Sequence, residues 1–138
     1  MSATPFTPAQ AMSGVPPHIV AEWDRCRPWL EAALEHDGGH YGIEDVWREV
    51  VSGSATFWPG KRSAVITQFW NFPRARTCNH WLAGGDMAEL LGEMQPVIDD
   101  WARANGCTEM TIAGRVGWVR AMKPFGFEPI FTVVRKRL

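Results

Sequence analysis

A glycine-containing junction at Trp81–Leu91, W-L-A-G-G-D-M-A-E-L-L, is the segment best suited to bind a charged ligand. Its apolar first half predicts a strand, its two glycines a turn, and Asp86 the start of a helix. The first turn of a helix has unpaired N–H groups and a partial positive charge, so such a junction can bind a phosphate. The same pattern also suits a tight structural turn between a strand and a helix. The sequence leaves both interpretations open.

Two other groups of residues have the types needed for chemistry but incomplete patterns. His36 and His40 flank a Gly-Gly pair and resemble two metal ligands, but no third and fourth ligand is evident, so we expect no metal. Cys78 and His80 share one face of an expected strand, as a nucleophile and its base would. No acid that would orient the histidine is indicated there.

The composition excludes several classes of protein. A chain of 138 residues is one domain by size, and a net charge of −1 does not supply a basic surface for nucleic acid. Three widely spaced cysteines predict reduced thiols. The N-terminus lacks a signal-peptide pattern, and the sequence has no run of about 18 apolar residues. We therefore expect a cytoplasmic protein that does not enter a membrane, with its eight tryptophans mainly filling the core.

The elements that must position these residues follow from periodicity and turn signals. A proline-rich arm, Met1–Pro17, precedes a single domain of residues 18–138. Helices are predicted over His18–Cys26, Pro28–His36, Ile43–Val51, Met87–Ala104 and Trp118–Lys123. Strands are predicted over Ala55–Pro59, Ala64–Phe72, Arg76–Ala83, Cys107–Ala113 and Ile130–Val134. Short turns between the first three strands imply an antiparallel meander.

The helix over Met87–Ala104 has the clearest pattern, because its apolar residues recur at spacings of three and four. Asp86 is predicted to cap its N-terminus, with Glu89 as the partner in a capping box. Pro96 lies inside the helix and should bend it, since its ring would face the carbonyl of Gly92.

This order of elements resembles the GNAT superfamily of acyl-CoA-dependent N-acyltransferases. The resemblance covers Ala55 to Leu138 and includes W-A-R-A-N-G-C at 101–107 and G-R-V-G-W-V-R-A-M-K-P-F-G-F at 114–127. It implies an α+β fold whose mostly antiparallel sheet is splayed at one parallel strand pair and flanked by helices. W-P-G at 58–60, W-L-A-G-G-D at 81–86 and I-A-G-R-V-G-W at 112–118 are similar to small GNAT-like proteins of bacteriophages and prophages.

The resemblance implies that acetyl-CoA binds in the splay between the two parallel strands. Its pantetheine arm would pair with the first of them, and its pyrophosphate would rest on the loop and helix that follow. Arg120 would contact the ribose phosphate, unless it is an ordinary surface arginine. The cofactor contacts implied are Trp81, Leu82, Ala83, Gly84, Gly85, Asp86, Met87 and Arg120.

Two features depart from the family's pattern. The family's loop usually reads Arg/Gln-x-x-Gly-x-Gly/Ala, whereas this chain has a shorter loop in which Asp86 puts a carboxylate where the pyrophosphate should lie. Like charges a few ångströms apart cost on the order of 1 kcal/mol. Met122 occupies the position of the tyrosine that often protonates the departing thiolate, and methionine has no proton to donate.

A general base is needed to deprotonate the attacking amine. His80 has the pKa that best matches this task, and Glu44 lies near the expected substrate entrance. Asp45 and Glu109 are further candidates, although Glu109 alternates with apolar residues and is expected to face solvent.

Two functions remain open. The first is an N-acyltransferase that transfers an acetyl group to an amine of a small molecule or protein. The second is a catalytically inactive GNAT-like protein of a phage virion or its assembly, which would use the arm and exposed tryptophans to contact other virion proteins. The corresponding locations are the cytoplasm of a bacterial host and the virion.

Overall fold

The computed structural model describes residues 14–114 and 117–138. The proline-rich arm predicted over Met1–Pro17 lies almost entirely outside these residues. All eight tryptophans are within them, and each is buried or half-buried, as expected of core residues.

Four strands form one sheet in the order β1-β2-β3-β4. β1, β2 and β3 are antiparallel neighbours, which confirms the meander, and β4 is parallel to β3. Gly84 and Gly85 belong to β3 and pair with Ala64 and Ser63, so the prediction that they form a turn after the strand was wrong. The strands span Thr56–Pro59 (β1), Ser63–Asn71 (β2), Arg76–Gly85 (β3) and Glu109–Ile112 (β4).

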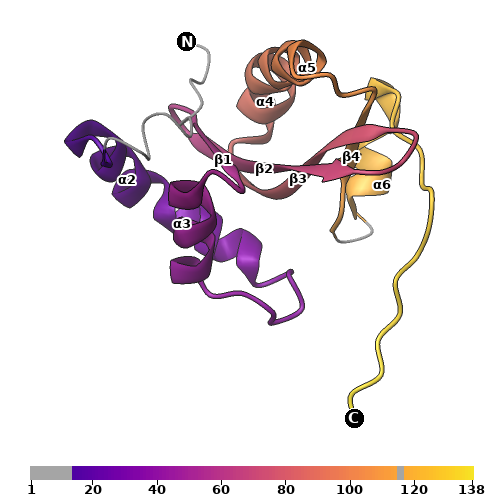
Figure 1. Cartoon of the computed structure of the whole chain (residues 1–138), viewed down its shortest axis with the longest axis horizontal. Helices are drawn as coiled ribbons and strands as arrows, with labels where there is room; N and C mark the ends of the chain where they lie inside the picture. The colour runs from indigo at the N-terminus through magenta and orange to yellow at the C-terminus, as the bar shows by residue number, and fades with distance from the viewer. Residues whose placement is uncertain (1–13, 115–116) are drawn as a thin grey trace.

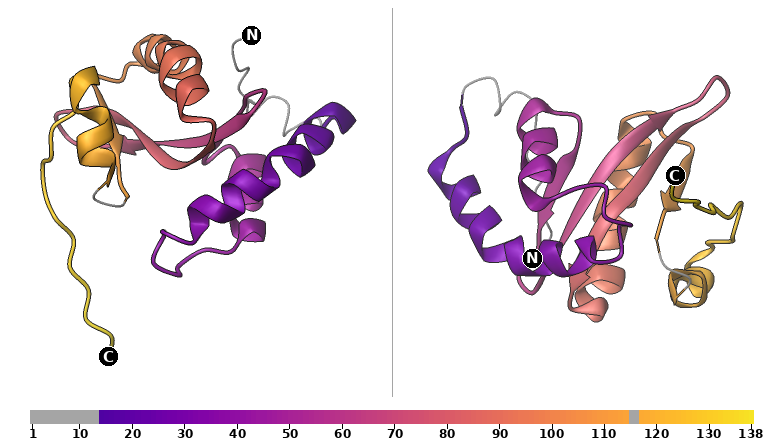
Figure 2. Two further views of the ribbon diagram at one scale, coloured as in Figure 1. Left: turned by 180° about the vertical axis from the view of Figure 1, so that it is seen from behind. Right: turned by 90° about the horizontal axis from the view of Figure 1, so that it is seen from below.

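Helices cover both faces of this sheet (Figures 1 and 2). On one face, α2 (Pro17–Leu34) and α3 (Ile43–Ser52) pack with the sheet around a core that includes Trp23, Leu30 and Phe57. On the other lies the long helix that begins with α4 (Met87–Glu89) and ends with α5 (Gln95–Ala104). Its residues Leu90, Met94 and Ile98 share a core with Trp58. The short α6 (Gly117–Met122) lies beside β4. Among the described residues, no helix is long and apolar enough to span a membrane.

The helix predicted over Met87–Ala104 is present and accommodates its proline by widening. Between α4 and α5, Leu90–Met94 is a π-helical turn in which the amide of Gln95 donates to the carbonyl of Leu90. Pro96 is then in the first turn of α5, where it needs no N–H partner. The wider turn thus gives the proline room that a regular α-turn would not.

Two predictions about elements were wrong. His18–Cys26 and Pro28–His36 form one helix, α2, with Pro28 inside it. The buried face of α2, which includes Trp23, Cys26 and Leu30, holds the helix together across the proline. The final strand predicted over Ile130–Val134 is absent: Ile130 and Phe131 are each 65% exposed, and the tail extends from the domain without pairing (Figure 1).

A bulge in β3 positions the side chains of the site. Thr67 of β2 pairs with His80 and Ile66 pairs with Leu82, so Trp81 is an extra residue in β3. Cys78 therefore packs on the α5 face, whereas Trp81 and Leu82 both pack on the α2 face. The parallel pairing ends at the same place, because His80 and Ile112 form the last β3–β4 pair. Beyond His80, β3 continues without a β4 partner, because β4 ends at Ile112.

A buried carboxylate ties the helix after β3 to the β1–β2 turn. Glu89 is 1% exposed and accepts hydrogen bonds from the amides of Lys61 and Arg62 and from Ser63 Oγ. Burial alone would raise the pKa of Glu89, but these hydrogen bonds lower it below its usual value. Glu89 is therefore not the capping-box partner predicted for Asp86. Its carboxylate oxygens accept hydrogen bonds from the β1–β2 turn instead.

We predict that Glu89→Ala lowers the free energy of unfolding by about 2–4 kcal/mol, because it leaves two amides and a hydroxyl without their acceptor. Urea unfolding measures this loss. Glu93→Ala, an exposed site on the same helix, should stay within about 0.5 kcal/mol of the wild type. Equal losses in the two variants would contradict the assigned role of Glu89.

Candidate functional site

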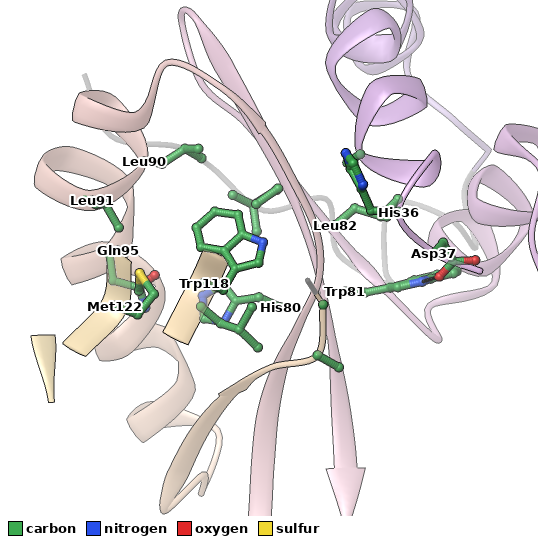
Figure 3. Close-up of a pocket in the computed structure, with 16 residues that line it drawn as sticks. His36, Asp37, His80, Trp81, Leu82, Leu90, Leu91, Gln95, Trp118 and Met122 are labelled. Carbon is green, nitrogen blue, oxygen red and sulfur yellow. Dashed lines mark hydrogen bonds between the residues drawn. The ribbon is translucent and has the colours of Figure 1, made fainter. Parts of the chain in front are cut away.

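A cavity of about 70 Å³ lies beside β3 at the place where β4 ends. Its walls come from both sides of β3: Asp37 and Trp81 lie on one side, and His80, Gln95 and Trp118 on the other (Figure 3). One water molecule needs about 10–15 Å³, so the cavity has room for small reacting groups. Side chains from both faces of the sheet thus meet in one cavity.

His80 is the most distinctive group in this cavity. Its side chain is 4% exposed, and its Nδ1 lies 2.9 Å from the carbonyl oxygen of Thr111 on β4. A carbonyl only accepts, so Nδ1 carries the proton and Nε2 of the neutral ring has a free electron pair. Nε2 is buried and has no hydrogen-bond partner among the described residues. The fold thus holds an oriented, available base in the cavity.

The surroundings keep His80 neutral. Burial lowers the pKa of His80 below its usual value, whereas the Thr111 carbonyl, Asp99 and Gln95 oppose this effect without outweighing it. Gln95 also lines the cavity, and its amide donates to Asp99 Oδ1 at 2.6 Å. At neutral pH the imidazole is therefore ready to accept a proton.

Two apolar side chains complete the wall beside His80. Trp118 of α6 lies next to the histidine, and Met122 lies with Gln95 farther from β3 (Figure 3). Met122 is 2% exposed and presents a thioether where the resemblance leads us to expect a tyrosine hydroxyl. Among the described lining residues on this side, the proton acceptor is thus present without a matching acid.

The start of the helix after β3 has few free N–H groups. Asp86 caps the helix as predicted: its Oδ1 accepts from the amide of Ala88 at 2.9 Å. The amide of Asp86 donates to the carbonyl of Arg62, also at 2.9 Å, and the Arg62 guanidinium lies 2.8 Å from Asp86 Oδ2. The hydrogen bond from Arg62, followed by that from Ala88, lowers the pKa of Asp86. The carboxylate therefore remains charged at the position predicted for the pyrophosphate.

The two glycines of this segment permit close packing. A Cβ on Gly84 would lie 2.4 Å from the carbonyl oxygen of Trp29, where α2 crosses β3. Gly85 has a φ of +108°, and a Cβ there would lie 2.4 Å from the carbonyl oxygen of Arg62. Close packing thus explains why both positions require glycine, without any ligand.

The remaining predicted site residues are distributed as follows. Trp81, Leu82 and Ala83 line the cavity, whereas Asp86, Met87 and Arg120 are not among its lining residues. Glu44 is ion-paired with Arg27 at 3.0 Å and also lies outside the cavity wall. Asp45 Oδ2 accepts from the amide of Gly42, and Glu109 is exposed as expected. The structure thus brings together His80 and Trp81–Ala83 but not Glu44.

Sequence reasoning did not identify Asp37 or Gln95 as cavity residues. Gln95 follows an unforeseen π-turn, and Asp37 comes from the loop after α2, far from β3 in the sequence. No local signal could have found them. Within residues 14–114 and 117–138, no group of three His, Cys, Asp or Glu residues is arranged to hold a metal ion.

Comparison with known proteins shows the fold. Neither a protein-family model nor a curated protein matches the sequence. Among solved structures, a probable acetyltransferase matches 100% of this chain and 97% of its own, with a TM-score of 0.63 at 10% identity. The ribosomal-protein-alanine N-acetyltransferase of Brucella melitensis biovar Abortus 2308 matches with a TM-score of 0.58 at 11% identity, over 100% of both chains. The chain has the fold of the GNAT acetyltransferases.

We predict that the buried, neutral His80 makes stability depend on pH. Its pKa is lower in the folded than in the unfolded chain, so the unfolded chain binds more protons as the pH falls below about 6.5. The free energy of unfolding should therefore decrease from pH 7 towards pH 5, and His80→Gln should reduce that slope. Urea titrations at several pH values measure it, with exposed His18→Gln as the control that keeps the wild-type slope. Equal slopes in wild type and His80→Gln would refute this assignment.

Proposed function

We propose that this protein is an N-acetyltransferase that transfers the acetyl group of acetyl-CoA to an amine, with His80 as the general base. The observation that carries the proposal is the unpartnered, buried Nε2 of His80 in a cavity lined from both faces of the sheet. The GNAT fold supports the same reaction by analogy alone, because fold does not establish function.

In this mechanism the amine approaches from the α2 side, past Asp37 and Trp81, and the acetyl donor from the α5 side. Bound acetyl-CoA supplies the thioester carbonyl as the electrophile. His80 Nε2 takes a proton from the ammonium, which frees the electron pair of the nitrogen for attack. The nitrogen attacks the thioester carbonyl, the C–N bond forms as the C–S bond breaks, and the nitrogen releases its second proton to solvent. The hydrogen bond from Nδ1 to Thr111 keeps the imidazole oriented throughout.

The edge of β3 fits the pantetheine arm. Trp81–Gly85 continues beyond the last pair with β4, so this segment has no β4 partner on that side. An extended ligand can hydrogen-bond to such an edge as an added strand. Leu82 and Ala83 line the cavity and belong to this part of β3, which supports the proposal that they contact the cofactor.

The helix start fits a pyrophosphate poorly. The amides of Asp86 and Ala88 already have acceptors, and the Asp86 carboxylate is negative. Arg62, 56% exposed in its side chain, partly offsets this charge. We therefore infer that the acetyl and pantetheine groups make the main contacts and that the pyrophosphate is held weakly.

The leaving thiolate must obtain its proton from solvent. Met122 lies in the cavity wall where an acidic side chain could protonate the thiolate, but a thioether has no proton to donate. The proposed reaction therefore relies on His80 and on positioning, which predicts a modest turnover.

We predict that His80→Gln lowers kcat for acetyl transfer by about 10²- to 10⁴-fold, because the amine loses its base. Acetyl-CoA affinity, measured by calorimetry, should change little. His18→Gln serves as the control and should retain full activity. Unchanged kcat in His80→Gln would rule out His80 as the base.

We predict that Asp86→Asn raises the affinity for CoA about fivefold, since it removes about 1 kcal/mol of repulsion. Asparagine also caps helices, so the fold should be kept. Calorimetric titration with CoA measures the effect, and Asp100→Asn, 82% exposed, is the matched control. An unchanged affinity would show that the pyrophosphate does not approach Asp86.

A second candidate function is a GNAT-like protein of a phage virion or its assembly that binds no acyl-CoA. The occupied amides at the helix start and the exposed apolar side chains of the tail, Ile130, Phe131, Val133 and Val134, support it. Calorimetry separates the two candidates: binding of acetyl-CoA to the wild type favours the enzyme, and no heat at millimolar ligand favours the interaction protein.

A further inference from the structure

Two buried acceptor atoms in the cavity lack hydrogen-bond partners among the described residues. They are His80 Nε2 and Asp37 Oδ2, which lie on opposite sides of β3 (Figure 3). The third buried polar atom without a partner in the described part of the chain is Arg76 Nε, which is a donor and belongs to a residue that does not line the cavity. A buried polar atom without a partner is costly. The cavity therefore favours a ligand with N–H donors at two places.

The surroundings of Asp37 favour a positive charge. The indole Nε1 of Trp81 lies 3.4 Å from Asp37 Oδ1 and donates to it, which leaves Oδ2 for another donor. Tyr41 packs against Trp81, with ring centroids 4.7 Å apart and an interplanar angle of 72°. A carboxylate next to aromatic rings suits an alkylammonium group, since the rings attract cations and cover the alkyl chain.

A metal ion fits this place poorly. The indole nitrogen is a donor without a free electron pair, so it cannot be a ligand. The described residues also contain no group of three metal-binding side chains around Asp37. An organic cation satisfies both the free carboxylate oxygen and the aromatic wall.

We propose that the acceptor is an aliphatic diamine, or a substrate with two amino groups, that spans the two sides of β3. One amino group gives a proton to His80 Nε2 and attacks the acetyl group, and the other stays an ammonium that donates to Asp37 Oδ2 beside Trp81. This inference rests on the proposed acetyltransferase function for the reacting end. The ammonium site at Asp37 follows from the geometry of the cavity alone.

The test compares the diamines putrescine and cadaverine with the monoamine n-butylamine. Binding is followed through the indole N–H signal of Trp81 in a proton–nitrogen correlation spectrum. Trp81→Phe identifies that signal among the eight indoles by its loss. At least one diamine should shift the signal at concentrations about tenfold lower than n-butylamine requires.

Asp37→Asn should abolish this preference, and Asp24→Asn, at an exposed site on α2, should retain it. In acetylation assays, KM for the preferred diamine should be about tenfold below that for n-butylamine in the wild type and equal to it in Asp37→Asn. Circular dichroism checks that the variants are folded. In the wild type, the Trp81 signal detects a ligand at Asp37 directly, so this part of the test does not depend on any variant.

The outcomes separate the two proposals. A diamine that shifts the Trp81 signal in a protein that binds no acetyl-CoA supports the ammonium site and refutes the acetyltransferase. Acetyl transfer with equal KM values for diamines and n-butylamine supports the enzyme and overturns the diamine inference. A preference that persists in Asp37→Asn overturns it as well.

Discussion

The extra residue in β3 is the constraint on which the rest of the site depends. Because Trp81 is inserted opposite Ile66 and Thr67, Trp81 and Leu82 both face α2, whereas a regular strand would place them on opposite faces. His80, the residue before Trp81, lies on the α5 side (Figure 3). The pairing with β4 ends at the same point, which opens the cavity between them. The bulge thus adds Trp81 to the α2 face while Leu82 stays in the core of that face, and His80 remains on the α5 side.

The bulge is useful only because both flanking layers are fixed. The β1–β2 turn is held from two directions: Arg25 of α2 donates to the carbonyls of Gly60 and Lys61, and Glu89 of α4 accepts from the amides of Lys61 and Arg62. The helices on the two faces of the sheet are therefore linked through one turn. This linkage sets the start of the long helix and, with it, the position of Gln95 in the cavity wall.

The same packing explains why the helix start is a poor anion site. Its amides and the glycines before it are used to bring α2, the β1–β2 turn and the end of β3 together. Groups that would contact a pyrophosphate in a longer loop serve the core here. Among the described residues, the buried acceptors that are still free to bind a ligand lie elsewhere: one on His80, which precedes these glycines in β3, and one on Asp37.

The sequence by itself determined the elements with strong local signals. The meander, the Asp86 cap and the long helix were predicted correctly, because turn residues, capping chemistry and apolar periodicity are local properties. Only the tertiary structure decided that α2 continues through Pro28, that Glu89 faces a distant turn and that Ile130–Val134 does not pair. It also decided which polar atoms remain without partners, since the cavity joins a loop after α2, a bulged strand and a helix after a π-turn. Those contacts depend on packing between segments far apart in the chain, which no local pattern specifies.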